Sequence, residues 1–509
     1  LYQLPKDIMP RSKTPSFVTG IPLVVDSAQE KVLLSRWQAG RQLYNACLNE
    51  AMVRMALVRQ SAAYQATRKL PKGKLRTAAF SAARTAYRYS EFALHAYAKL
   101  TADRSKWLAA KLDANTQQTI ATRAFKTSER VLFGKARKVR YKVPTRFRCL
   151  EGKTNKQGIR WTGEGLTWGK LYIPGMIDPD NKVMQHGLTS PIKYVRLLWR
   201  ELNGVRRWYA QLICEGLPYA KPENYVSKGT VGLDLNVSNV AFVADDQAGL
   251  LPFAEGVPTF EQEISALQRQ MERSKRANNP DNFEPAFTAR RGRKTVKKKG
   301  KSKKGKRQWH NSNRYRTLTR KKRELERRKV AYAKSQNRRL VNELLRHGNH
   351  IKTERVSVKG WQKRYGKAIA AKSPGFFQAE LVRKAANAGG SVTKFSTQTT
   401  ALSQTHLTGE HIKKSLSERV HHDQTGRVMH RDLFSAYLAR YVVQDKLSLQ
   451  DAVDQYPGME AALLGAWEHD QSAKRVGAAE SPKSEPPVEQ IPSHSEKASQ
   501  ISHSGLKAC

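Results

Sequence analysis

Three separated stretches of this sequence, residues 228–250, 349–396 and 430–470, alternate between the apolar spacing of a β-strand and that of an α-helix. A long helical and basic segment separates the first stretch from the second. Strands that alternate with helices bury their apolar faces by packing into one layered α/β unit. We therefore predict an α/β domain whose sheet is assembled from distant parts of the chain, with the residues between them as an insertion.

Each of the three stretches carries one conspicuous acid. Asp234 lies within the apolar strand VGLDLN, Glu354 lies near the end of IKTERV, and Asp432 opens the helix of HRDLFSAYLARYV. An Asp inside a strand is unfavourable, because burial of an unpaired carboxylate costs free energy. A divalent cation removes that cost, and three convergent carboxylates can hold two Mg²⁺ ions, roughly 4 Å apart, around a scissile phosphate. The three acids are therefore candidate catalytic residues and metal ligands, for Mg²⁺ or for Mn²⁺.

Taken one at a time, the acids have ordinary structural explanations. Asp432 suits the first turn of a helix, where it offsets the helix dipole. Glu354 could pair with Lys352 or Arg355, and Asp234 could be a turn acid at a strand end. The three together, in the order Asp, Glu, Asp within a basic chain, are much more specific and favour the catalytic explanation.

The charge of the chain indicates its partner. Lys and Arg number 92 and Asp and Glu number 43, which gives a formal net charge of +49. Such an excess repels itself in a compact fold and is tolerated chiefly where a polyanion neutralises it. Nucleic acid is the leading partner, because each phosphate contact releases counterions. An anionic membrane surface is the competitor.

Further features bear on where the protein acts. The sequence has no apolar run of about 18 residues that could span a bilayer, and its first residues lack the apolar core of a signal peptide. We expect a soluble cytoplasmic protein without a membrane partner. The four cysteines form no CxxC pair, which argues against a disulfide framework and against a thiolate zinc site. They are Cys47, Cys149, Cys214 and Cys509.

The remainder of the chain divides by its periodicity. Residues 36–140 have apolar positions at helical spacing, whereas residues 141–227 are short β-rich runs broken by Gly, Pro and Asn. A strand near residues 16–25 could join the β-rich part, which would make the helical part an insertion within a small barrel or sandwich. Four tryptophans of the β-rich part are expected in its core, with stacking on bases near a duplex fork as the alternative. They are Trp161, Trp168, Trp199 and Trp208.

A basic helical hairpin is expected at residues 261–348. Thr259 and Gln262 have capping-box spacing at the start of its first helix. Residues 290–307 hold twelve basic residues out of eighteen and no acid, so we expect a flexible loop that presents cations to a duplex backbone. A coiled-coil module is the alternative, which the charge of the loop disfavours. The Ser-, Pro- and Glu-rich residues 471–509 are expected to be disordered.

Three motifs resemble those of a known family. GLDLNVSNVAF, IKTERVSVKGW and HRDLFSAYLAR are similar to the three split RuvC motifs of the transposon-encoded TnpB nucleases and their descendants, the compact type V CRISPR effectors. The resemblance covers most of the chain. It implies a multidomain α/β + α + β fold class, with an RNase H-like RuvC nuclease domain, a β-barrel wedge domain and a helical recognition domain. The implied ranges are 1–35 and 141–227 for the wedge domain, 36–140 for the recognition domain, 228–260, 349–396 and 430–470 for the RuvC domain, 261–348 for its basic helical insertion, 397–429 for a degenerate zinc-ribbon-like segment and 471–509 for a disordered tail.

The resemblance also implies an activity. Asp234, Glu354 and Asp432 would be the catalytic, metal-binding triad of an RNA-guided DNA endonuclease. Such a protein holds a guide RNA, reads a short adjacent motif in double-stranded target DNA, forms an RNA–DNA heteroduplex and cuts the DNA in one RuvC site by two-metal-ion hydrolysis. It would act in a prokaryotic cytoplasm, on nucleoid DNA. The resemblance suggests a monomer for some members and a dimer for others, and of the two we favour a monomer here. The alternative is an RNA-guided DNA-binding repressor or recruiter with little or no cleavage, which the intact triad disfavours.

One segment departs from the family pattern. Family members usually carry a four-cysteine zinc ribbon before the third RuvC motif, and here the corresponding positions hold His406, Thr408, Asp423 and Thr425. Threonine is a poor zinc ligand, so we expect no structural zinc. Ser435 also departs, since the family often has Asn there. Five side chains of the segment could still capture a metal, namely His406, His411, His421, His422 and Asp423.

Overall fold

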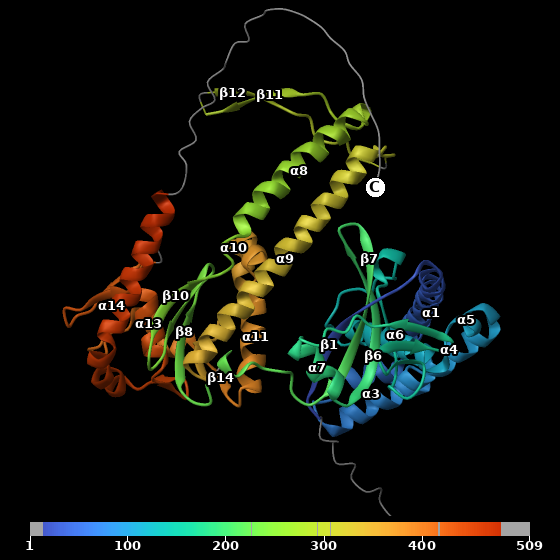
Figure 1. The fold of residues 1–509 in the computed structure, drawn as a ribbon, viewed down its shortest axis with the longest axis horizontal. Helices are drawn as coiled ribbons and strands as arrows, with labels where there is room; N and C mark the ends of the chain where they lie inside the picture. The colour runs from blue at the N-terminus through green and yellow to red at the C-terminus, as the bar shows by residue number, and fades with distance from the viewer. Residues whose placement is uncertain (1–13, 225, 293, 306, 416–417, 480–509) are drawn as a thin grey trace, which may run out of the picture.

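The computed structural model describes residues 14–479 except 225, 293, 306 and 416–417. Figure 1 shows two bodies side by side, with a long pair of helices that rises from the second. The first body contains the elements up to residue 215, and the second contains those from residue 230 onward. In this described part of the chain, no helix is both long and apolar enough to cross a membrane.

The first body contains a four-stranded antiparallel sheet in the order β1–β7–β6–β2. Strand β1 pairs along its whole length with β7, from Ser16 opposite Glu215 to Leu23 opposite Trp208. The predicted pairing of the early strand with the later β-rich part is therefore confirmed, and the helices between β1 and β2 are inserted into this sheet. The strands are β1 (Ser16–Leu23), β2 (Cys149–Glu151), β6 (Ile192–Leu202) and β7 (Val205–Glu215).

The inserted helices pack against the sheet in one core. The first of them begins at Ser27, earlier than the predicted residue 36, because Asp26 forms a capping box with Gln29. Leu43 and Ile120 of the longest helices are buried in this core. The helices are α1 (Ser27–Gln60), α2 (Ala62–Lys69), α3 (Lys74–Ala86), α4 (Glu91–Arg104), α5 (Lys106–Lys111) and α6 (Ala114–Leu132).

A second, three-stranded antiparallel sheet completes the β-rich part. Its strands are β3 (Ile159–Thr162), β4 (Gly165–Trp168) and β5 (Leu171–Pro174). The 3₁₀ turn η1 (Pro144–Arg146) precedes β2, and α7 (Lys182–Thr189) packs against β1. The core explanation for the four tryptophans is confirmed, because all of them are buried: Trp161, Trp168, Trp199 and Trp208.

The second body is built around a five-stranded sheet in the order β10–β9–β8–β13–β14. Strands β8, β9 and β10 form an antiparallel meander, and β13 and β14 continue the sheet parallel to β8. The predicted sheet is confirmed for the stretches 228–250 and 349–396, with β10 as a strand that was not predicted. The third stretch, 430–470, adds no strand to this sheet and instead provides helices that pack on it. The strands are β8 (Thr230–Leu235), β9 (Asn239–Val243), β10 (Ala248–Pro252), β13 (His350–Glu354) and β14 (Ser391–Phe395).

Helices cover both faces of this sheet. On one face, Leu233 and Ile351 pack with the end of α9 and with α11. On the other face, Ala241 and Phe395 pack with α13 and α14. The helices are α9 (Asn313–His347), α10 (Val358–Lys372), α11 (Pro374–Asn387), α13 (Arg431–Ala439) and α14 (Leu449–Ala479). The short connecting elements are η2 (Pro222–Asn224), α12 (Thr397–Thr400), η4 (Leu402–Gln404), β15 (Val420–His422), β16 (Val428–His430), β17 (Val442–Val443) and β18 (Lys446–Leu447).

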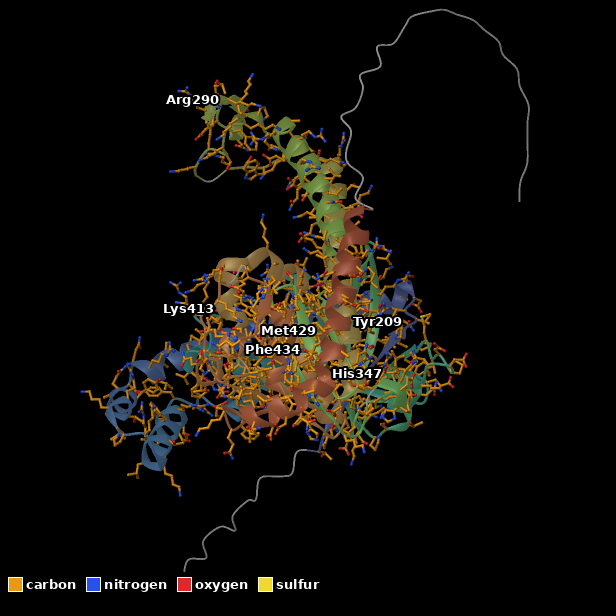
Figure 2. The ribbon with its side chains drawn as sticks, turned by 90° about the vertical axis from the view of Figure 1, so that its left-hand side faces the viewer. Tyr209, Arg290, His347, Lys413, Met429 and Phe434 are labelled. Atoms are coloured by element: carbon orange, nitrogen blue, oxygen red, sulfur yellow. The ribbon has the colours of Figure 1, made fainter. Side chains whose placement is uncertain are left out.

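The prediction of a flexible loop at residues 290–307 is wrong in part, because a β-hairpin forms there. Helices α8 (Val257–Ala277) and α9 run side by side to a tip that carries η3 (Pro280–Asn282), β11 (Phe287–Arg291) and β12 (Lys294–Lys298). Strands β11 and β12 pair antiparallel, and Figure 2 shows Arg290 at this tip, well above Phe434 in the body.

Aromatic contacts at the base of the tip explain why so charged a segment can pair. The rings of Phe283 and Trp309 meet with centroids 5.7 Å apart, and Nζ of Lys275 lies 3.8 Å from the centroid of the Trp309 ring. The N–H of Glu284 donates to the carbonyl of Lys301, which extends the pairing beyond the hairpin. The ends of the segment are fixed in this way, so its strands pair through backbone groups alone.

Two predicted boundaries also differ. Helix α8 begins at Val257 with Gly256 at its N-cap and no side-chain cap, so the predicted capping box at Thr259 is wrong. Pro258 lies in the first turn, where proline is favoured because its missing N–H would have no helical partner. Helix α14 continues to Ala479, so residues 471–479 are helical rather than part of a disordered tail. The rest of that tail lies outside the described residues.

Candidate functional site

Two of the three predicted acids lie side by side on adjacent parallel strands. Leu233 of β8 pairs with Thr353 of β13, so the next residue of each strand, Asp234 and Glu354, comes at the same level of the sheet. Side chains at one level of parallel strands point to the same face. Leu233 packs on the face that α9 and α11 cover, so both acids point to the face that α13 covers.

Helix α13 brings the third acid to this face. Asp432 is the second residue of α13 and only 3% exposed. Its backbone N–H donates to Nδ1 of His430, which caps the helix, at 3.3 Å. The predicted first-turn position of Asp432 is therefore confirmed.

Gly232 permits the close packing of α13 on β8. It lies two residues before Asp234 on the same face of the strand. A Cβ atom at this position would come 2.0 Å from the carbonyl oxygen of Ala436, in the middle of α13. A larger side chain could not fit unless α13, which carries Asp432, moved away from the sheet.

The substitution Gly232→Ala is expected to displace α13 and to destabilise the second body by about 1–3 kcal/mol, as overpacked cores are. Urea unfolding followed by hydrogen exchange within α13 measures the loss. The matched control is Gly20→Ala in β1, where a Cβ atom would meet nothing within 4 Å. Equal stability of the two variants would show that α13 does not depend on this close contact.

The three carboxyl groups influence one another. Burial raises the pKa of Asp234 well above its ordinary value, and the charges of Asp432 and Glu354 raise it further. Arg431 and Arg419 act in the opposite direction on the pKa of Asp234. Burial also raises the pKa of Glu354. A raised carboxyl pKa marks surroundings that disfavour negative charge, and a bound cation would relieve this strain on the site.

Three polar neighbours hold Asp432. Nδ2 of Asn236 donates to its Oδ2 at 2.9 Å, and Nη1 of Arg419 donates to the same oxygen at 3.2 Å. Nε of Arg431 lies 3.6 Å from Oδ1 of Asp432. The Asp432 carboxylate is therefore oriented from the residue that follows β8 on one side and from the segment before β15 on the other.

Asn236 and Arg419 were not among the predicted site residues. Asn236 could have been predicted from the sequence, because it lies two residues after Asp234 near a strand end and so points to the same face. Arg419 could not have been predicted from the sequence, because its position depends on the pairing of β15 with β16. Its carbonyl accepts from the N–H of Arg431 at 2.9 Å, directly beside Asp432.

The ordinary pairing considered for Glu354 is contradicted. Nζ of Lys352 donates to the carbonyl of Arg440 at 2.7 Å. Nη2 of Arg355 donates to the carbonyl of Lys394 at 3.2 Å. Both neighbouring cations are thus used by backbone groups elsewhere, and neither accounts for the carboxylate of Glu354.

The potential ligand atoms of the site are of the kind that Mg²⁺ and Mn²⁺ prefer. The three acids offer only carboxylate oxygens, and Asn236 has its amide oxygen left over, which are the hard ligands that these ions prefer. The three acids do not crowd around one point. Within the described residues, another set of three side chains has its ligand atoms within 4.8 Å of one another. That set is His406, His421 and Asp423. Carboxylates that share two ions do not have to meet at one point, so this arrangement is compatible with a pair of ions.

This second group lies in the segment that replaces the zinc ribbon. His406, His421 and Asp423 are buried together. His411 instead lies 3.1 Å from the hydroxyl of Thr405, and His422 is exposed. The structure therefore gathers three of the five side chains that were considered for metal capture.

Hydrogen bonds explain the burial of this group without a metal. The carboxylate of Asp423 accepts from Nε2 of His421 at 3.1 Å, from the N–H of Leu407 at 3.0 Å and from the hydroxyl of Thr425 at 2.7 Å. Nζ of Lys414 donates to Nδ1 of His421, which leaves the imidazole neutral with its proton on Nε2. The ammonium of Lys414 also opposes a second cation here, which supports the prediction that the segment binds no structural zinc.

Acid is expected to loosen this segment, whereas chelation is not. Burial lowers the pKa of His421 to about 4, from an ordinary 6.5. The folded segment therefore holds fewer protons than the unfolded one between these pH values, so its stability is full above pH 6.5 and falls as the pH drops towards 4. The shift corresponds to roughly 3 kcal/mol.

Hydrogen exchange of residues 405–430, corrected for intrinsic rates, measures this loss. Burial raises the pKa of Asp423, but hydrogen bonds, chiefly from Thr425, lower it to about 2, so Asp423 stays charged over the window. Treatment with EDTA at pH 7.5 is the control and is expected to change nothing. Exchange that increases with EDTA at neutral pH would instead identify a bound metal.

Comparisons with known proteins give structural similarity alone. No protein-family model matches the chain, and no curated protein matches it significantly. The cryo-EM structure of a Cas12f1–sgRNA–target DNA complex is similar at a TM-score of 0.41 and 10% identity, over 84% of this chain and 98% of that one. A CRISPR-Cas12f ternary complex is similar at a TM-score of 0.29 and 10% identity, over 81% of this chain and 82% of that one. The chain is thus similar over most of its length to Cas12f structures, at an identity too low to assign roles to its residues.

Proposed function

We propose that this chain is an RNA-guided DNA endonuclease with a single RuvC-type site, in which Asp234, Glu354 and Asp432 are the catalytic, metal-binding residues. The observation that carries the proposal is the convergence of three acids from distant segments on one face of a sheet, where burial and mutual repulsion raise the pKa of Asp234. The joining of an antiparallel meander to two parallel strands supports an RNase H-like fold for this body.

The chain's residues have distinct tasks in this proposal. Mg²⁺ or Mn²⁺, when bound, would activate the attacking water and stabilise the leaving 3′ oxygen of a phosphodiester. Asp234 and Glu354 provide carboxylates from paired strands, and Asp432 provides one from the first turn of a packed helix, so all three are held on rigid elements. Asn236 fixes the orientation of the Asp432 carboxylate through its hydrogen bond. Arg419, with its side chain 55% exposed, lies beside Asp432 and can donate to a substrate phosphate.

The proposed partners are a guide RNA and double-stranded target DNA, the kinds of molecule named in the similar Cas12f1 complex. The net charge of +49 supports a polyanionic partner. We assign the four- and three-stranded sheets of the first body to a β-barrel wedge domain and helices α1–α6 to a recognition domain, with the α8–α9 pair as a basic insertion. The protein would act as a monomer and read the heteroduplex through its backbone, leaving the choice of sequence to base pairing.

A second candidate is an RNA-guided DNA-binding protein that cuts little or not at all. The observation that favours it is the contact of Arg419 with both oxygens of Asp432, at 3.2 and 3.5 Å, where a guanidinium competes with a metal ion. The presence of all three acids favours the nuclease.

Sequencing of the RNA that copurifies with the protein, followed by exposure of the complex to a plasmid library with a randomised flank, tests the proposal. Cuts that match the guide, need Mg²⁺ or Mn²⁺ and vanish in EDTA are the expected result. Guided binding without cuts at any concentration of either metal would favour the second candidate. A protein with no discrete RNA and no guided binding would contradict both.

A further inference from the structure

A cavity of about 430 Å³ lies in the first body, where α1, the turn η1 and the strands β6 and β7 meet. This size is ordinary for a site that binds one small organic molecule. Three aromatic side chains and three polar ones, two of them cationic, make up most of its lining, and no acid lines it. They are Trp37, Phe147 and Trp199, with Gln38, Arg41 and Arg206.

The cationic and aromatic groups of the cavity are fixed against one another. The guanidinium of Arg206 lies 4.9 Å from the centroid of the Trp199 ring, and its Nη1 donates to Glu30 at 2.9 Å. The guanidinium of Arg148 lies at the same distance from the same ring. Two guanidinium groups therefore contact one indole, which holds the Trp199 ring in place. Glu30 balances the charge of Arg206, and Arg41 is the second cation of the lining.

Hydrogen-bond donors without acceptors gather around this cavity. Among the described residues, twelve buried side-chain nitrogen or oxygen atoms lack a hydrogen-bond partner. Three of them belong to residues that line the cavity, and all three are N–H donors: Nε1 of Trp37, Nε1 of Trp199 and Nε of Arg206. Buried donors are normally paired, so these three call for acceptors that the chain itself does not provide.

We propose that this cavity binds one unstacked nucleotide of the nucleic acid that the protein holds, an inference that rests on the proposed function. A nucleotide combines the three properties that the lining selects, because it is flat, rich in acceptors and anionic. Its base would enter the cavity edge-on, and its carbonyl oxygens would accept from the indole N–H groups of Trp37 and Trp199. Its phosphate would lie at Arg41, as a charge-assisted pair.

Other occupants fit the lining less well. A cationic ligand would face Arg41 and Arg206, and Glu30, the carboxylate that contacts Arg206, does not line the cavity. An apolar peptide side chain would fill the aromatic part but leave the three N–H donors without acceptors. A bound polyanion also supplies nucleotides at a high local concentration, which a free ligand does not.

Ultraviolet crosslinking of the full-length protein with its copurified RNA, followed by peptide mass spectrometry, tests the inference. Crosslinked nucleotides are expected on peptides that contain Trp37, Phe147 or Trp199. The substitution Arg41→Ala is expected to lower that yield roughly fivefold and the salt dependence of binding by about one unit of log K per log salt. Trp199→Phe keeps the aromatic wall and removes one donor, so it should lower the yield with an unchanged fold. Arg104→Ala, at an exposed arginine of α4 away from the cavity, is the matched control.

Two arms of the experiment identify the source of the nucleotide. Crosslinks that form in the RNA complex alone indicate the guide RNA, whereas crosslinks that require added target indicate the DNA. Nucleic acid that binds and is cut, with no crosslink in either arm and with Arg41→Ala equal to Arg104→Ala, would overturn the cavity inference alone. Absence of both bound RNA and guided DNA binding would overturn the proposed function, and the inference with it.

Discussion

The substitution Asp234→Asn is expected to abolish guided DNA cleavage and to leave nucleic acid binding intact. Asn keeps the shape of Asp but loses the charge that a divalent cation requires. Loss of a residue that only supports a metal ligand lowers metal affinity or activity by about 10–100-fold. Loss of a direct carboxylate ligand between two strongly coupled acids is expected to cost at least about a thousandfold in the cleavage rate. Single-turnover cleavage of a guide-matched plasmid, beside a filter-binding assay, measures the two effects separately.

The same variant distinguishes a catalytic acid from a structural one. Burial, Asp432 and Glu354 raise the pKa of Asp234, so the folded protein binds its proton more tightly than the unfolded chain does. The charged carboxylate therefore destabilises the fold at neutral pH, and this cost decreases as the pH falls. In EDTA, Asp234→Asn is expected to melt at the same temperature as the parent or above it. Added Mg²⁺ should stabilise the parent more than the variant.

An exposed acid provides the matched control for this substitution. Asp103 on α4 pairs with Lys99 at the surface, so Asp103→Asn should leave both cleavage and melting unchanged. If Asp234→Asn instead melts well below the parent in EDTA, Asp234 has a structural role. If it cuts DNA at the parent rate, the three acids are not the catalytic site.

The strands around the candidate site could be predicted because each one carries its own local signal. Asp234 interrupts an apolar run. A charged residue inside a buried strand is uncommon unless the charge binds a ligand or a partner group. Helix α11 and strand β14 are separated by Gly389 and Gly390, a stop that the sequence displays directly. These signals act over fewer than about ten residues, so they remain readable without the fold.

The environment of Asp432 could not be predicted, because it depends on contacts between distant residues. Arg419 reaches Asp432 only through the register of β15 and β16, in which Val420 lies opposite His430. The same register buries His421 and exposes His422, since neighbouring residues of a strand face opposite sides. Of the five candidate metal ligands in the sequence, the fold therefore brings only three close together.

The charged hairpin shows a different limit of sequence reasoning. Composition alone indicated that residues 290–307 could not form a core, and they do not. The strands β11 and β12 form nevertheless, because Phe283 and Trp309 fix the ends of the segment and backbone groups complete the pairing. Charge excludes a buried core, but it does not exclude a ladder of backbone hydrogen bonds, such as this one, in which every residue of β12 is exposed.

Replacement of five lysines at this tip by glutamine is expected to weaken nucleic acid binding by roughly a thousandfold near physiological salt. All five are exposed on β12 or just after it: Lys294, Lys297, Lys298, Lys301 and Lys303. Each phosphate contact contributes about 0.9 to the slope of log K against log salt. Loss of five contacts should therefore reduce that slope by about four to five units. Titration of a labelled duplex at several salt concentrations measures the affinity and the slope together.

The charge-preserving variant, with arginine at the same five positions, is the control and should bind as the parent does. Because β11 and β12 pair through backbone groups, glutamine should leave the hairpin folded, which circular dichroism and hydrogen exchange can verify. A reduced slope with a folded hairpin would show that this tip lies against phosphates. An unchanged slope would mean that the exposed cations of the hairpin face solvent in the complex and that the first body carries the electrostatic part of binding.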